Sequence, residues 1–196
     1  MSKLYFQYWA MWAGKTLELI KVAYNYTERW MNVVIFNSKI DTRFETDKVS
    51  SRSGSAISSM PYDSETDFLE TIERLKSIKP IDCILVDESQ FLKKHQVDDL
   101  AVVVTSMDIP VMCFWIKTDF QWSLFEWSKR LLEIAQKIDE IKTICWCSNK
   151  ATMNARIADW KMLTEWEQIE IWENDKYISL CLKHYLEKNI WWGFNS

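Results

Sequence analysis

The sequence predicts an α/β domain built on a parallel β-sheet, followed by a smaller C-terminal unit. Short apolar segments alternate with amphipathic segments through the first 140 residues, which is typical of strands and helices in βαβ units. From Cys145 onward the segments become short and polar, as in hairpins. We therefore expect a first domain over residues 1–140 and a second over residues 141–196.

The individual elements follow from the spacing of apolar residues. Short, nearly continuous apolar segments predict buried strands. These segments span residues 4–8, 33–36, 81–86, 110–114 and 141–145. Apolar residues three and four positions apart predict helices over residues 17–29, 64–76, 96–107 and 124–137. The helix at 64–76 is expected to begin at Ser64, with Asp67 three residues on. Residues 48–59, rich in serine and without either period, are expected to form a loop or hairpin.

Composition limits the class of protein. The 196 residues are 48% apolar, enough for a sizeable core, and their net charge of −4 argues against general binding to nucleic acid or membrane surfaces. No segment approaches the roughly 18 continuous apolar residues of a membrane span, and the N-terminus has no signal-peptide pattern. We expect a cytoplasmic protein. Its five cysteines then indicate free thiols or a metal site.

The segment 9–16 has the layout of a phosphate-binding loop. It follows a predicted strand, ends in Gly14-Lys15-Thr16 and leads into a predicted helix. Backbone N–H groups of such a loop bind polyphosphate, while the lysine reaches the β- and γ-phosphates and the threonine binds Mg²⁺. An ordinary strand-to-helix turn is the alternative, and the first glycine position of the motif is occupied by Trp9.

Two carboxylates, Asp87 and Glu88, end the apolar strand predicted at residues 81–86. In nucleotide-binding folds of this type, a carboxylate there helps to hold Mg²⁺, and its neighbour can serve as a base. Because ligands bind at the carboxyl ends of parallel strands, these residues and Lys15 are expected at one site. The alternative is that the two carboxylates begin a solvated loop.

The second unit contains two close pairs of possible metal ligands. Cys145 and Cys147 form one pair, and Cys181 and His184 form the other. Thiolates and imidazole are natural tetrahedral ligands of Zn²⁺, and four protein ligands would make the site closed and structural. Small buried cysteines and a surface histidine are the alternative. Cys83 and Cys113 lie inside apolar segments and are expected in the core.

Aromatic residues follow several of the predicted strands. Phe91, Phe120 and Phe125 fall in the connecting loops, where a planar base could stack between their rings. Packing in the core is the alternative for each of them.

Several motifs in register carry a resemblance to a known family. They are Met11 with Gly14-Lys15-Thr16, Asp41-Thr42-Arg43, Val86-Asp87-Glu88-Ser89-Gln90-Phe91, Lys117-Thr118-Asp119-Phe120, Lys142-Thr143-Ile144-Cys145, and Lys176-Tyr177 through Cys181 to His184. On these motifs nearly the whole chain resembles the cellular-type (type II) thymidine kinases, in their bacterial branch. The resemblance implies a P-loop (RecA-like) parallel sheet flanked by helices, plus a small C-terminal zinc-binding subdomain carrying a lasso loop.

The function implied by the resemblance is transfer of the γ-phosphoryl of ATP to the 5′-hydroxyl of thymidine, which forms dTMP in pyrimidine salvage for DNA synthesis. It implies Mg²⁺ with ATP, a structural Zn²⁺, a homotetramer and feedback inhibition by dTTP. Glu88 would be the general base, and Arg43, with Asp41, would lie near the transferred phosphoryl group. Zinc at Cys145, Cys147, Cys181 and His184 would anchor the lasso.

The resemblance also implies the ligand-binding residues. ATP and Mg²⁺ would be bound by Trp9, Ala10, Met11, Trp12, Ala13, Gly14, Lys15, Thr16, Asp87, Glu88, Ser89 and Gln90. The thymidine pocket would be formed by Met11, Asp41, Arg43, Phe91, Ile116, Phe120, Phe125 and Tyr177. The lasso, whose backbone would read the edge of the base, would contribute Gln168, Ile169, Glu170, Ile171 and Trp172.

Tryptophan is unusually frequent and glycine unusually rare. The chain has 3 glycines, against roughly 14 expected at the usual ~7%, and 12 tryptophans. Tryptophan stands where the family has, or commonly has, glycine; these positions are Trp30, Trp115, Trp122, Trp127, Trp160, Trp166 and Trp172. Trp30 also falls just past a predicted helix, where glycine usually sits. Our hypothesis is that most of these codons are UGA read as glycine in the source organism.

Three other interpretations remain open on the sequence. The chain could be a nucleotide-binding switch that phosphorylates nothing, or a kinase inactivated if the tryptophans are genuine. It could also be a zinc-ribbon protein that binds nucleic acid, against which the acidic composition argues.

Overall fold

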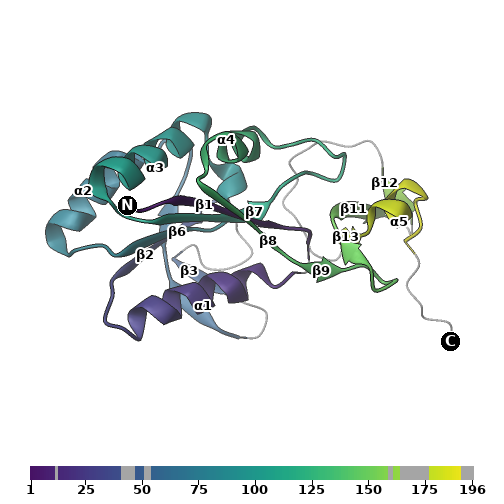
Figure 1. The fold of residues 1–196 in the computed structure, drawn as a ribbon, viewed down its shortest axis with the longest axis horizontal. Helices are drawn as coiled ribbons and strands as arrows, with labels where there is room; N and C mark the ends of the chain where they lie inside the picture. The colour runs from purple at the N-terminus through teal and green to yellow at the C-terminus, as the bar shows by residue number, and fades with distance from the viewer. Residues whose placement is uncertain (12, 41–46, 51–53, 159–160, 164–176, 191–196) are drawn as a thin grey trace.

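The computed structural model describes residues 1–11, 13–40, 47–50, 54–158, 161–163 and 177–190. A six-stranded parallel sheet in the order β5-β2-β6-β7-β1-β8 forms its centre (Figure 1). The strands are β1 (Leu4–Trp9), β2 (Val33–Ser38), β5 (Met60–Tyr62), β6 (Cys83–Val86), β7 (Val111–Ile116) and β8 (Lys137–Ile141). The expected parallel sheet is therefore confirmed.

Helices cover both faces of this sheet, as expected for a parallel sheet whose strands are apolar on both sides. Helix α1 (Lys15–Thr27) lies on one face, and α2 (Phe68–Ile78), α3 (Lys94–Met107) and α4 (Glu126–Ile134) lie on the other (Figure 1). Buried aliphatic and aromatic side chains of β1, β6 and β7 form the core between the layers. Cys83 and Cys113 are fully buried there, as predicted.

A small C-terminal lobe lies at the end of the molecule where β1 and β8 finish (Figure 1). It consists of β9 (Thr143–Ile144), β10 (Lys150–Ala151), β11 (Met153–Ala158), β12 (Lys161–Leu163), β13 (Tyr177–Leu180) and α5 (Leu182–Leu186). Strands β12, β11 and β13 form an antiparallel sheet with its own apolar cluster. The division of the chain at residues 140 and 141 stays a prediction.

Three expected elements begin or end elsewhere. Helix α2 begins at Phe68, because Asp67, and not Ser64, accepts the hydrogen bond from Glu70 N–H that caps it (2.9 Å). The helix expected over residues 124–137 ends earlier, and Lys137 begins strand β8. This strand ends at Ile141, the residue at which an apolar strand was expected to begin. Strand β5 was not predicted at all. Within residues 48–59, β3 (Lys48–Ser50) and β4 (Ala56–Ser58) pair antiparallel, as the hairpin alternative predicts.

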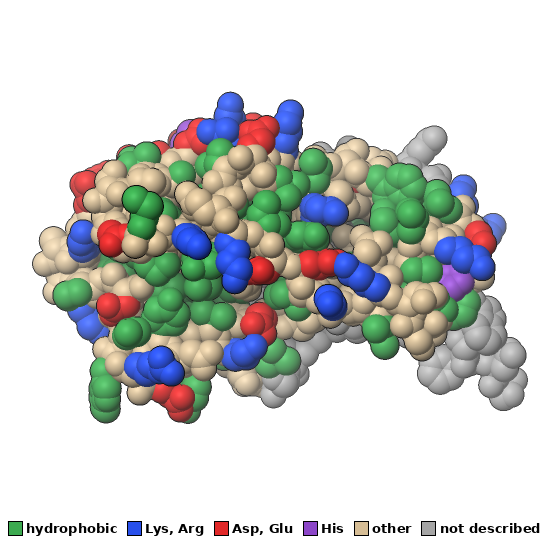
Figure 2. All heavy atoms as spheres, viewed as in Figure 1, with side chains coloured by type: hydrophobic (Ala, Val, Ile, Leu, Met, Phe, Trp, Pro, Cys, Tyr) green, Lys and Arg blue, Asp and Glu red, His purple; other side chains and the backbone are tan. Residues whose placement is uncertain are grey.

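The surface carries charges of both signs. Basic and acidic side chains are interspersed over the face shown in Figure 2, with hydrophobic side chains between them. Among the residues described, no helix combines the length and the apolar character needed to cross a bilayer.

Candidate functional site

The phosphate-binding loop connects β1 to α1, as the sequence predicts. Gly14 precedes the first residue of α1 and has a φ of 76°, a left-handed conformation that favours glycine. A Cβ at this position would meet nothing within 4 Å, so the backbone conformation, and not space, requires glycine here. The helix begins at Lys15, which places the loop at the positive end of the helix dipole, where anions bind well.

Lys15 and Glu88 meet across the ends of two strands. Lys15 Nζ forms an ion pair with Glu88 Oε1, and the Glu88 side chain is only 2% exposed. The ammonium group also lies over the ring of Trp115, 3.9 Å from its centroid. The phosphate loop and the carboxylate after β6 therefore lie at one site.

Glu88 is held firmly in an uncommon conformation. Its φ is 51°, its Oε2 accepts a hydrogen bond from Gln90 Nε2 (2.7 Å), and its N–H donates to Asp87 Oδ1 (2.9 Å). Left-handed backbone at a non-glycine residue costs on the order of 1–3 kcal/mol and is concentrated at functional sites. The buried carboxylate is thus aimed by its own backbone and by a neighbouring amide.

Tyr62 of β5 supports the same segment. Its hydroxyl donates to the carbonyl of Glu88 (2.7 Å), and burial, with the Asp87 carboxylate nearby, raises the pKa of Tyr62 well above its ordinary value. The hydroxyl therefore stays protonated and remains a donor. Sequence reasoning missed this residue, because the strand that carries it was not predicted. Ser89 and Gln90 are also buried, and Ser89 Oγ donates to the carbonyl of Phe114 (3.2 Å).

Trp9, at the first glycine position of the motif, is the last residue of β1. Its indole is 4% exposed and packs near Phe114 and Trp115, with ring centroids 6.4 and 6.5 Å away. The ring thus contributes to the core. Residues Trp9 and Ala10 also belong to the lining of a pocket of about 150 Å³ between the loop and the C-terminal lobe.

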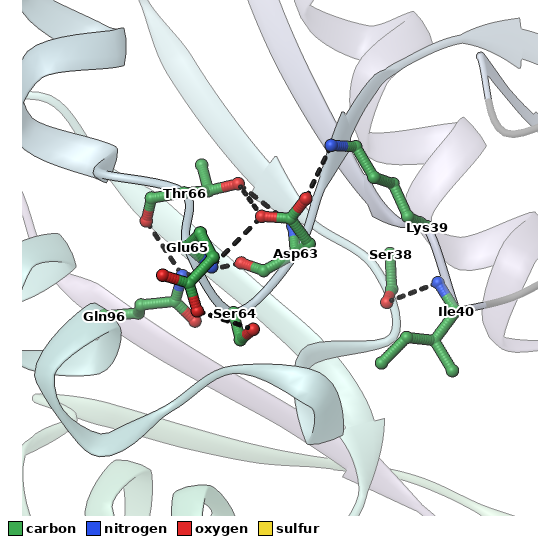
Figure 3. A network of polar contacts seen from close by, with 8 residues as sticks. All are labelled: Ser38, Lys39, Ile40, Asp63, Ser64, Glu65, Thr66 and Gln96. Atoms are coloured by element: carbon green, nitrogen blue, oxygen red, sulfur yellow. Dashed lines mark hydrogen bonds and ion pairs between the residues drawn. The ribbon is translucent and has the colours of Figure 1, made fainter.

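A network of polar contacts lies where β2 and β5 end (Figure 3). Lys39 Nζ donates to Asp63 Oδ2 (2.6 Å), and this bond contributes most to lowering the pKa of Asp63 below its ordinary value. Gln96 Nε2 donates to the carbonyls of Asp63 (2.9 Å) and Thr66 (2.8 Å). The network connects the ends of β2 and β5 to the first turn of α3.

The four predicted metal ligands come together. The ligating atoms of Cys145, Cys147, Cys181 and His184 lie within 4.8 Å of one another. Nδ1 of His184 is 3.4 Å from Sγ of both Cys145 and Cys181, and the Sγ atoms of Cys147 and Cys181 are 3.9 Å apart. Tetrahedral zinc with bonds of about 2.0–2.3 Å places its ligand atoms roughly 3.5–3.8 Å apart. The donor set and its geometry therefore fit Zn²⁺.

Two neighbours complete this cluster. Hydrogen bonds from Asn149, first of all from its backbone N–H, lower the pKa of the Cys147 thiol and so favour the thiolate that a metal needs. Trp146 stacks on the His184 ring, with centroids 4.0 Å apart and planes 12° apart, and its Nε1 donates to the carbonyl of Asn189 (3.3 Å). The tryptophan holds the imidazole in its orientation.

The residues expected around thymidine that the structure describes lie in or against the main core. Buried members are Met11, Ile116, Phe120, Phe125 and Tyr177, and Phe91 is partly buried against them. Phe120 and Tyr177 meet edge to face, with centroids 6.4 Å apart. The guanidinium of Arg156, a residue that sequence reasoning missed, lies 5.9 and 5.8 Å from these two rings. Expected site residues outside the described part of the chain are Trp12, Asp41, Arg43, Gln168, Ile169, Glu170, Ile171 and Trp172.

Similarities to known proteins cover nearly the whole chain. A family model described as thymidine kinase matches residues 2–185. The thymidine kinase of Streptococcus gordonii is 50% identical over 191 residues, which cover 97% of this chain and 99% of that protein. Those of Streptococcus agalactiae and Streptococcus pyogenes are 49% identical over 191 residues, which cover 97% of this chain and 100% of theirs. The matched span includes the phosphate loop, Glu88 and the four metal-ligating residues.

Proposed function

The chain belongs to the thymidine kinase family, and on this premise we propose that it transfers the γ-phosphoryl of ATP to the 5′-hydroxyl of thymidine. The observation that carries the proposal is the meeting of Lys15 and Glu88 at the carboxyl ends of β1 and β6. Phosphoryl transfer needs positive charge on the phosphates and a base at the acceptor hydroxyl, within one small site. Lys15 and Glu88 are groups of these two kinds.

We assign each residue one step. Lys15 exchanges its ion pair with Glu88 for the β- and γ-phosphates of ATP, and this exchange frees the carboxylate. Glu88 then accepts the proton of the 5′-hydroxyl as that oxygen attacks the γ-phosphorus. Arg43 adds positive charge near the transferred group. Thr16 and Asp87 would hold Mg²⁺, which supplies further positive charge at the phosphates.

The base of the nucleoside is proposed to bind between the two parts of the protein. Met11, Ile116, Phe91, Phe120, Phe125 and Tyr177 line this pocket in the proposal. The lasso, residues 168–177, reads the edge of the base and is anchored by structural Zn²⁺. A homotetramer in the cytoplasm and inhibition by dTTP complete the proposal by analogy with the family.

An ATP-dependent phosphorylation assay tests the proposed function. Purified protein is incubated with Mg²⁺, ATP and either thymidine, deoxyuridine or deoxycytidine, and nucleoside monophosphates are separated and counted. Formation of dTMP as the preferred product supports the proposal. Binding of ATP without any monophosphate product would instead favour the nucleotide-binding switch.

A further inference from the structure

Two side chains of the C-terminal lobe form hydrogen bonds to the backbone of the phosphate loop at Met11. Asn154 Oδ1 accepts a hydrogen bond from Met11 N–H (2.8 Å), and the Ser179 hydroxyl donates to the Met11 carbonyl. Asn154 of β11 and Ser179 of β13 are directly opposite each other in the antiparallel ladder. One cross-strand pair therefore satisfies both backbone polar groups of a single loop residue.

The same lobe also contacts the loop after β7. Asn154 Nδ2 donates to the carbonyl of Thr118 (3.1 Å), and the Tyr185 hydroxyl donates to the carbonyl of Phe120. The amide of Asn154, a residue that is only 2% exposed, therefore bonds to both loops. All four acceptors and donors on the loops belong to the backbone, so these contacts restrain conformation and contribute no charge.

Such restraint matters because a phosphate loop binds through its backbone. Phosphate is recognised by N–H groups whose directions depend on the φ and ψ angles of the loop. The N–H of Met11 is already bonded to Asn154. Other N–H groups of the loop would then bind phosphate, and a loop fixed at Met11 loses less conformational entropy when ATP binds.

We propose that Asn154 and Ser179 are positioning residues that hold the phosphate loop ready for ATP, so that the metal-binding lobe sets the affinity for nucleotide. The connection to the metal cluster is short, since Ser179 lies two residues before the ligand Cys181 in the chain. This inference rests on the proposed function only in assuming that the loop binds ATP. It does not depend on which nucleoside is phosphorylated.

Substitutions at Ser179 provide the sharpest test. Ser179→Ala removes the donor to Met11, whereas Ser179→Thr keeps the hydroxyl at a strand position that suits a β-branched residue. Binding of a fluorescent methylanthraniloyl analogue of ATP with Mg²⁺ is measured by titration, alongside zinc content and thermal unfolding. Loss of one such hydrogen bond is expected to weaken binding by about 2- to 10-fold in Ser179→Ala, and Ser179→Thr is expected to restore it.

Asn154→Leu removes two hydrogen bonds and is expected to weaken binding more than Ser179→Ala does. Lys161→Ala, an exposed change on β12 of the same small sheet, is the matched control and is expected to bind as the wild type does. With thymidine as acceptor, the KM for ATP should rise in Ser179→Ala while the KM for thymidine changes little. If Asn154→Leu does not fold, the comparison of Ser179→Ala with Ser179→Thr is sufficient to test the inference.

Two results would overturn the inference. One is wild-type nucleotide affinity in a folded, zinc-containing Ser179→Ala variant. The other is an equal loss of affinity in Ser179→Thr or in Lys161→Ala. Failure of the proposed function has a different signature, since a wild-type protein that binds the analogue but phosphorylates no nucleoside still permits every binding comparison.

Discussion

At the scale of single residues, Glu88 is the side chain on which the proposed chemistry depends most directly. It is buried, adopts a left-handed backbone conformation and forms an ion pair with Lys15. A carboxylate held in this way can accept a proton without first having to find its orientation. Its conformation is maintained by hydrogen bonds from Tyr62, to the Glu88 carbonyl, and from Gln90, to the Glu88 carboxylate.

Replacing Glu88 by glutamine should abolish most of the turnover and spare nucleotide binding. The amide keeps the shape of the side chain but cannot accept the proton, so kcat should fall by about 10²- to 10⁴-fold. Affinity for the ATP analogue should stay equal or increase, because Lys15 no longer has to leave a carboxylate. Steady-state kinetics and analogue titration measure the two quantities, and a fully active Glu88→Gln protein would remove Glu88 from the role of base.

Trp30 has a left-handed backbone conformation that disfavours any side chain with a Cβ. Met31 N–H donates to the Tyr26 carbonyl (3.1 Å), and Trp30 N–H donates to the Thr27 carbonyl (3.0 Å). These two bonds define a Schellman motif at the end of α1, whose left-handed position usually holds glycine. Trp30 occupies that position with a φ of 63°, and its side chain is 96% exposed. The strain is therefore not offset by packing.

Trp30→Gly is expected to stabilise the protein. Relief of a left-handed side chain is worth about 1 kcal/mol, which corresponds to a rise in Tm of roughly 2–4 °C for a chain of this size. Trp30→Ala is the control, because it removes the indole but keeps the Cβ that causes the strain, and it should not raise Tm. Differential scanning calorimetry distinguishes the two variants; equal Tm values for them would assign the effect to the exposed ring.

At the scale of elements, the four candidate metal ligands all lie in the C-terminal lobe. The lobe has a small apolar cluster of its own, and two of its buried members, Cys145 and Cys181, are among the candidate metal ligands. A unit with so little apolar surface gains much of its stability from coordination. The lobe in turn carries the side chains that contact Met11, Thr118 and Phe120.

Removal of zinc should expose thiols in a defined order. With zinc bound, coordination protects Cys145, Cys147 and Cys181, while burial raises the pKa of both Cys83 and Cys113 to about 12 and keeps them unreactive. A chromogenic disulfide reagent should therefore find almost no reactive thiol in the holoprotein, three after chelation, and all five after unfolding. Equal reactivity before and after chelation, with no zinc released, would contradict the metal site.

At the scale of the whole molecule, the structure separates the tryptophans that fit their surroundings from those that do not. Trp146 stacks on a metal ligand and forms a hydrogen bond. Trp30 and Trp122 instead adopt left-handed conformations, and Nε1 of buried Trp127 has no hydrogen-bond partner among the described residues. Several such costs, of about 1–3 kcal/mol each, are large against a domain stability of ~5–15 kcal/mol.

The gene itself tests the hypothesis that most tryptophans are glycines. We expect UGA at Trp30, Trp122 and Trp127, and UGG is compatible with the fitted Trp146. The intact protein from its source should then be lighter than the printed sequence requires. UGG at most tryptophan positions, or a mass that matches the printed sequence, would reject the hypothesis.

Most of the sheet could be predicted from the sequence, because buried parallel strands are continuous apolar segments. The two edge strands could not. Strand β5 is three residues long and contains Pro61, which is tolerated there because an edge strand has one unpaired side. Strand β8, at the other edge, is half polar and does not have the apolar pattern of a buried strand.

The sequence by itself determined the candidate residues for chemistry: the Gly14-Lys15-Thr16 loop, the carboxylates after β6 and the four candidate metal ligands. These motifs are recognised by residue type and by short spacing along the chain, both of which can be read from the sequence. Only the tertiary structure decided that Lys15 pairs with Glu88, that Tyr62 bonds to the Glu88 backbone, and that Asn154 and Ser179 bond to Met11. The physical reason is separation along the chain: Met11 and Asn154 are 143 positions apart, and no local pattern specifies which distant side chain will satisfy a loop backbone.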